Sequence, residues 1–285
     1  MRALWRSALI ALPLFAFDRN GAPGPSPAVE RVTIHFRAIV GAEPFACGRT
    51  YDGIGATRAH VTPHALSLYV HDVRLVATDG HTVPIALDDD STWQGQGVAL
   101  LNFTEGPGIC ANSTVGIHDI VQGTVASGQY VGIAFTLGVP FPLNHTDLTT
   151  AHAPLDLTRM FWSWNAGHKF LRLDLTTSKA QPWFMHLGST GCTPDQPAVR
   201  PPVSCANANL ATVQLDGFDP DKSVVVLDVA ALLAHANVEH NQPHTAPGCM
   251  SDPLDTDCAP VFESLGLPFG AHAATPQTAF RIARP

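Results

Sequence analysis

Residues 32–38, with the sequence VTIHFRA, are the stretch from which the fold class of this chain is most directly predicted. Apolar V, I, F and A lie on one face of an extended chain, and T, H and R lie on the other. Alternation with a period of two is typical of a half-buried β-strand. The pattern recurs and predicts further strands over residues 66–76, 98–103, 130–137, 170–175, 183–187, 211–215 and 223–227.

Turn-forming residues are frequent between these segments. The 285 residues include 23 glycines and 24 prolines, which favours short strands and turns over long helices. Helical periodicity is convincing only over residues 228–236, with Asp228 as the N-cap, and over residues 260–265. We therefore predict an all-β fold, a single antiparallel β-sandwich domain over residues 29–285 with long disulfide-stapled loops and one or two short helices.

Composition and charge exclude several classes of protein. With 45% apolar and 14% charged residues, the chain is neither disordered nor a coiled coil. The net charge of −8 and the lack of any run of Lys or Arg argue against nucleic acid and anionic membrane surfaces as partners. Common enzyme motifs such as Gly-x-Ser-x-Gly and His-Glu-x-x-His are also missing, although an exported enzyme with an unrecognised site stays an alternative.

The first 28 residues are predicted to be a signal peptide and a flexible leader. Arg2 and Arg6 precede an apolar run over residues 8–17, which is too short to cross a bilayer of about 30 Å as a helix. We expect a secreted chain without a membrane anchor. A buried N-terminal segment is the alternative.

Cysteine usage supports export. An even number of cysteines without a CxxC pair argues against zinc ribbons and thioredoxin-like redox sites. Six cysteines allow fifteen pairings, among which the sequence alone does not choose. Because short loops close most easily, disulfides between Cys192 and Cys205 and between Cys249 and Cys258 are favoured, which leaves Cys47 to pair with Cys110.

Histidine is unusually frequent, with 14 copies, and this suggests a metal site. Imidazole suits Zn, Cu, Fe and Ni, and thioether sulfur selects Cu(I). The loop with His235, His240, His244 and Met250 is weak support for an accessory site.

Residues 160–170, MFWSWNAGHKF, are the most informative segment. In a strand, Met160, Trp162 and Trp164 would project to one face. Such tryptophans usually pack in a core or form a platform for a sugar ring. A carbohydrate- or ligand-binding β-sandwich that uses Trp162, Trp164 and Trp183 is therefore one interpretation.

Together with residues 69–75 (YVHDVRL), 139–145 (VPFPLNH), 186–192 (HLGSTGC) and 248–251 (GCMS), this segment resembles the MbnP family of copper-binding proteins, also called metallo-mystery-pair four-Cys proteins. The resemblance implies a periplasmic, non-enzymatic protein in copper homeostasis. It also implies an MbnH-like dihaem partner of the cytochrome c peroxidase and MauG group. In this family the partner oxidises the first tryptophan of WxW to kynurenine, and Cu(I) binding depends on that change.

Carried over residue by residue, the modified side chain is Trp162, and Trp164 either relays electrons from it or packs beside it. His186, which opens the HLGSTGC motif, is the first choice of copper ligand, and His145 is the second. His71 and His35 lie in predicted strands and are further candidates. The roles of two other residues are left open by the sequence. Met160 is either a weak axial donor to copper or a core residue. His168 stands at a position where the family has Tyr and is either a packing residue or an extra ligand.

Overall fold

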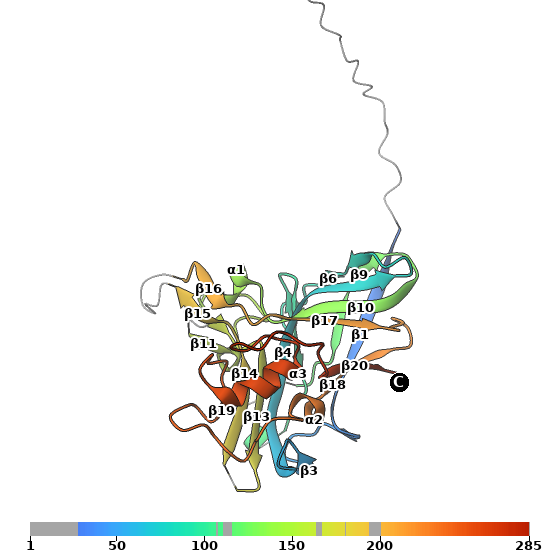
Figure 1. Cartoon of the computed structure of the whole chain (residues 1–285). Helices are drawn as coiled ribbons and strands as arrows, with labels where there is room; N and C mark the ends of the chain where they lie inside the picture. The colour runs from blue at the N-terminus through green and yellow to red at the C-terminus, as the bar shows by residue number, and fades with distance from the viewer. Residues whose placement is uncertain are drawn as a thin grey trace, which may run out of the picture.

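A computed structural model describes residues 28–106, 108–110, 116–163, 167–179, 181–193 and 201–284. Most described strands belong to two sheets (Figure 1). One sheet has the strand order β20-β18-β1-β9-β6, with β2 beside β1. Its strands are β1 Val29–Val40, β2 Glu43–Pro44, β6 Ala86–Leu87, β9 Ile120–Ala126, β18 Val224–Asp228 and β20 Phe280–Ala283.

The second sheet has the order β17-β10-β4-β13-β14-β19, with β3, β5 and β8 also paired to β4, and β7 paired to β8. Its strands are β3 Tyr51–Ile54, β4 Ala59–Ala77, β5 Thr82–Pro84, β7 Gln94–Gly95, β8 Val98–Asn102, β10 Tyr130–Leu137, β13 Leu171–Thr177, β14 Pro182–Leu187, β17 Ala211–Asp216 and β19 Gly248–Cys249. Two small ribbons complete the strands: β11 Phe161–Ser163 with β12 Gly167–His168, and β15 Thr190–Thr193 with β16 Ser204–Asn207.

Aromatic side chains join the two large sheets. Phe36 of β1 meets Phe135 of β10 edge to face with 5.7 Å between ring centroids, and Phe135 meets Phe280 of β20 in the same way at 5.4 Å. All three rings lie in one hydrophobic cluster. Along β1, Ile34 and Phe36 are buried whereas His35 and Arg37 are exposed, as the period-two pattern predicts. The mostly β class is confirmed.

Each predicted strand is present, with ends that differ by at most three residues except in β4, which begins at Ala59 and not at Leu66. Pairing is antiparallel except between β1 and β18 and between β14 and β19, which run parallel. Both predicted helical segments contain a short helix: α2 Val229–Leu232, where the Asp228 carboxylate accepts the first backbone N–H groups, and α3 Ala259–Ser264. The sequence analysis missed β9, β20, the shorter strands such as β3, β15 and β16, and the short helix α1 Phe141–Asn144.

Three disulfides close loops of the described chain: Cys47–Cys110, Cys192–Cys205 and Cys249–Cys258. The last two are the pairs that short-loop closure favours, and the first is the pair that remains. No helix among the described residues is long and apolar enough to cross a membrane. The predicted signal peptide and leader fall almost entirely on residues 1–27, outside the described residues.

Candidate metal-binding site around Trp162 and His186

Neighbouring strands β13 and β14 supply the polar residues of the site. In β13, Leu171, Leu173 and Leu175 are buried, so Arg172 and Asp174 point to the opposite face of the sheet. Arg172 pairs in register with His186 of β14. The alternation of the strand therefore places a guanidinium, a carboxylate and an imidazole on one face.

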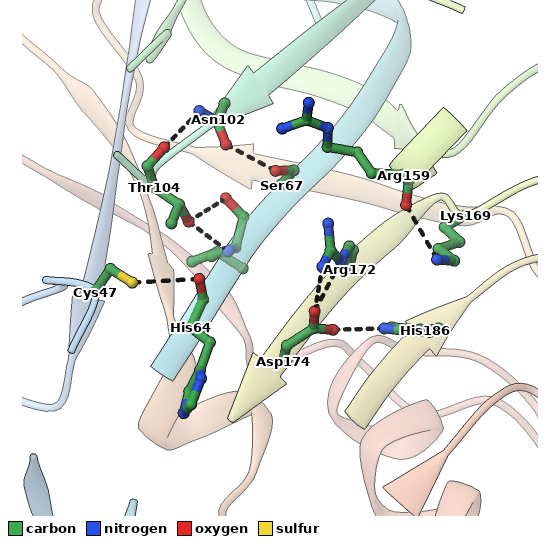
Figure 2. Close-up of polar contacts among 11 residues, drawn as sticks. Cys47, His64, Ser67, Asn102, Thr104, Arg159, Lys169, Arg172, Asp174 and His186 are labelled. Atoms are coloured by element: carbon green, nitrogen blue, oxygen red, sulfur yellow. Dashed lines mark hydrogen bonds and ion pairs between the residues drawn. The ribbon is translucent and has the colours of Figure 1, made fainter. Parts of the chain in front are cut away.

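These three groups form a compact arrangement in which His186 is buried and Arg172 and Asp174 are half-buried. Figure 2 shows Arg172 and His186 reaching the Asp174 carboxylate from two directions. His186 Nε2 lies 2.6 Å from one carboxylate oxygen, and Arg172 Nε donates to the other at 2.9 Å. Burial by itself would raise the pKa of Asp174, but the hydrogen bonds from His186 and Arg172 outweigh it and lower that pKa to about 2. Asp174 is thus a carboxylate at any physiological pH.

His186 is neutral in this setting. Burial lowers the pKa of its imidazole; the bond to Asp174 opposes this, and the charges of Lys169 and Arg172 add to the lowering. A carboxylate can only accept, so the proton of the neutral ring sits on Nε2. The lone pair is therefore on Nδ1, which is buried and has no hydrogen-bond partner among the described residues. A histidine fixed through one nitrogen by a carboxylate, with the other nitrogen free, is the usual arrangement of a metal ligand.

Trp162 lies beside this imidazole. The ring centroids of Trp162 and His186 are 6.4 Å apart, with the planes tilted by 48°. Trp162 is half-buried in β11, and its six-membered ring lies against Gly188. A Cβ atom at position 188 would come within 2.4 Å of Trp162 Cζ3 and 2.9 Å of the His168 carbonyl oxygen. Glycine at 188 is therefore required for the indole to occupy this position.

Two further cations lie close to the site. Lys169 Nζ donates to the Arg159 carbonyl oxygen at 3.0 Å (Figure 2). Burial, and then the charge of Arg172, lower the pKa of Lys169, while Asp174 partly offsets this. Arg159 Nη1 is buried without a partner among the described residues. The positive surroundings favour the neutral form of His186, which is the form that binds metals.

Comparison with known proteins agrees with the motifs. The family model MbnP matches residues 29–251. The chain belongs to the MbnP family. Its structure is similar to that of MbnP from Methylosinus trichosporium, with a TM-score of 0.79 and 30% sequence identity over 90% of this chain and 99% of that chain. No curated protein sequence matches this MbnP-family chain.

The other histidines predicted as ligands lie in different surroundings. His145 follows α1, and its Nε2 faces the Cys192–Cys205 disulfide, 3.4 Å from Cys205 Sγ. His71 of β4 is half-buried, and its Nδ1 lies 3.0 Å from the Gly138 carbonyl oxygen. His35 is exposed on the other large sheet. Of the four, the structure brings His186 into ring contact with Trp162.

His168 and Met160 are packing residues of this MbnP-family fold. His168 is fully buried, and its two ring nitrogens lie 2.8 Å from the Asn144 carbonyl and 2.9 Å from the Leu155 carbonyl. Neither nitrogen therefore has a free lone pair directed at a ligand. Met160 is fully buried within the main hydrophobic cluster.

The remaining tryptophans and histidines named in the sequence analysis do not contribute to the site around Trp162 and His186 among the described residues. Trp164 lies outside the described residues. Trp183 is 2% exposed and belongs to the core, so it offers no platform for a sugar. His235, His240 and His244 are exposed and do not form a group with ligand atoms close together in the part of the chain that the structure describes.

Sequence reasoning missed Arg159, Lys169, Arg172, Asp174 and Gly188. One signal was available: Arg172 and Asp174 are charged residues that alternate with the leucines of the strand over residues 171–175. The alternation indicates their shared face. It does not indicate that His186 lies on the neighbouring strand.

Proposed function

We propose that this MbnP-family chain is a periplasmic Cu(I)-binding protein in copper homeostasis, and that an MbnH-like dihaem partner completes its copper site by oxidising Trp162 to kynurenine. The chain is the substrate of that oxidation and is not itself an enzyme. The observation that carries the proposal is the unpartnered, buried Nδ1 of His186 beside Trp162. Three disulfides support an oxidising compartment.

The chemistry of the indole explains why Trp162 has to change. The indole nitrogen offers one N–H donor and no free lone pair, so an intact tryptophan is a poor ligand. Oxidative opening of the five-membered ring gives an aryl amine and a ketone, which have lone pairs. Because Trp162 contacts the ring of His186, the new donors arise next to an imidazole that already has a free lone pair.

The donor atoms and the nearby charge are also compatible with copper. Imidazole is an established copper ligand, and kynurenine adds nitrogen and oxygen donors. Asp174 supplies the negative charge next to the imidazole and fixes its tautomer, while Arg172 holds Asp174 in place. Trp162 is half-buried, so part of this residue is accessible to a separate oxidising protein.

Mass spectrometry of the intact chain tests the modification. Protein coexpressed with the dihaem partner is expected to carry the tryptophan-to-kynurenine increment at Trp162, and protein made alone is not. Trp162→Phe should remove the increment, and Trp183→Phe, which changes a tryptophan of the buried core, should retain it. Trp164→Phe tests the relay hypothesis through the yield of modification.

Copper affinity is measured on the same samples by competition with a chromophoric Cu(I) chelator. Modified wild type should bind Cu(I) more tightly than unmodified protein. Asp174→Asn should lower the affinity by about 10–100-fold, because the partner that orients the imidazole is lost. Equal affinity before and after modification would contradict the proposal.

The carbohydrate interpretation has little support from the fold, because Trp183 is buried. Loss of oligosaccharide binding in Trp162→Ala, with no effect of copper, would favour it instead.

A further inference from the structure

A second group of soft ligand atoms lies at the Cys192–Cys205 disulfide. One Nε2 or Nδ1 atom of His145 and the two Sγ atoms all lie within 4.8 Å of one another. In the part of the chain that the structure describes, this is the one group of at least three His, Cys, Asp or Glu residues with ligand atoms so close together. The kynurenine-dependent site proposed above uses neither sulfur.

Regular structure holds the two sulfurs side by side. Cys192 of β15 lies directly opposite Cys205 of β16 in an antiparallel pair, with Thr190 opposite Asn207 at the other end. Backbone pairing of this kind does not depend on the S–S bond, so the two side chains stay adjacent when that bond is broken. Figure 1 shows β15, β16 and α1 grouped at one end of the molecule.

Asn144 fixes which nitrogen of His145 offers a lone pair. The Asn144 side-chain oxygen accepts the backbone N–H of His168 at 2.7 Å, so its other terminal atom is the amide nitrogen. That nitrogen lies 3.2 Å from His145 Nε2 and can only donate. Nε2 is therefore an acceptor: its lone pair accepts from the Asn144 amide, and the same atom lies 3.4 Å from Cys205 Sγ, so a copper ion bound here would take the place of that amide hydrogen.

Burial distinguishes this disulfide from Cys249–Cys258. His145 and Cys192 are buried, whereas Cys205 is half-exposed. Cys249 and Cys258 are both fully buried. Cys205 is therefore the more accessible of the two cysteines to a reductant, while His145 and Cys192 would hold the bound ion from the buried side.

We propose that reduction of Cys192–Cys205 converts this cluster into a Cu(I) site with two thiolates and the imidazole of His145. A vicinal dithiol is the reductant. Its thiolate attacks Cys205 Sγ, the S–S bond breaks and Cys192 leaves as a thiolate that takes up a proton. The second thiol of the reductant then displaces Cys205 and closes the disulfide of the reductant, so that two electrons and two protons reach the chain.

Cu(I) then replaces the two thiol protons, which are released. Thiolates are soft ligands that favour Cu(I), whereas disulfide sulfurs carry no charge and bind it poorly. A structural zinc site takes four ligands, and this cluster supplies three. Copper binding here depends on the redox state of the disulfide and is independent of kynurenine.

The experiment uses the full exported chain made without the dihaem partner, so that Trp162 remains an indole. Anaerobic protein, oxidised or reduced with a phosphine, is titrated with Cu(I) against a chromophoric chelator. X-ray absorption identifies the atoms bound to copper. Reduced protein should bind Cu(I) with sulfur and nitrogen ligands, and oxidised protein should show no sulfur ligation.

Variants assign the ligands. The double variant Cys192→Ser/Cys205→Ser should lose the copper–sulfur signal, and His145→Gln should weaken binding by at least about 10-fold. The matched control Cys249→Ser/Cys258→Ser removes the same number of thiols and should retain the signal. Persistence of sulfur ligation in the first double variant would overturn the proposal.

Alkylation of the wild-type chain gives a result that does not depend on the folding of variants. In reduced protein, Cu(I) should protect Cys192 and Cys205 from iodoacetamide, as read by peptide mass spectrometry. Equal labelling of both cysteines with and without copper would overturn the proposal. Since Trp162 is unmodified throughout, neither outcome depends on whether the kynurenine-dependent site exists.

Discussion

Asp174→Asn should remove a stabilising contribution that depends on pH. The pKa of Asp174 is lowered from 3.8 to about 2 in the folded protein. Because the folded pKa lies below the unfolded one, the contribution is fully present above about pH 4 and is lost as the pH falls through about 2. At about 1.4 kcal/mol per pH unit, the shift corresponds to about 2 kcal/mol of unfolding free energy at neutral pH.

Urea unfolding with intact disulfides measures this contribution. The difference in unfolding free energy between wild type and Asp174→Asn should be about 2 kcal/mol at neutral pH and shrink towards zero near about pH 2. Asp216→Asn, at an exposed position of β17, removes the same charge and should change stability by less than about 0.5 kcal/mol. A difference that stays constant between about pH 7 and pH 2 would refute the assignment of the stabilisation to the Asp174 carboxylate.

Three other substitutions test packing and capping. Gly188→Ala should lower the free energy of unfolding by about 1–3 kcal/mol and reduce the yield of Trp162 modification, because the new Cβ would clash with the indole. Chemical denaturation measures the first effect and intact mass the second. The control Gly128→Ala, at an exposed position, should leave the yield unchanged. Phe135→Ala should lower the free energy of unfolding, measured by chemical denaturation, by about 3–5 kcal/mol, because this ring joins the two sheets. A decrease of less than about 1 kcal/mol would contradict that role. Asp228→Ala should lower the free energy of unfolding by about 1–2 kcal/mol, and with it the melting temperature, because the Asp228 carboxylate caps α2 and accepts the Gly41 N–H. An unchanged melting temperature would show that the cap does not stabilise the protein.

Local patterns account for the parts of the fold that were predicted. Alternation in β1 and β13 depends on the two faces of a single strand, so it is visible in one dimension. The N-cap at Asp228 is equally local, since its carboxylate accepts N–H groups two and three residues later. The parallel pairing of β1 with β18 joins segments almost 190 residues apart, and no local pattern signals it.

For the site, the sequence by itself determined the family motifs, the identity of Trp162 and His186 as candidates, and the even set of cysteines. Only the tertiary structure decided that Asp174 holds His186 through Nε2 and leaves Nδ1 free, and that His145 faces a disulfide. The physical reason is that the side of an imidazole available to a ligand depends on which groups fold against its other side. Those groups come from neighbouring strands and loops, whose pairing the order of residues along one strand does not specify.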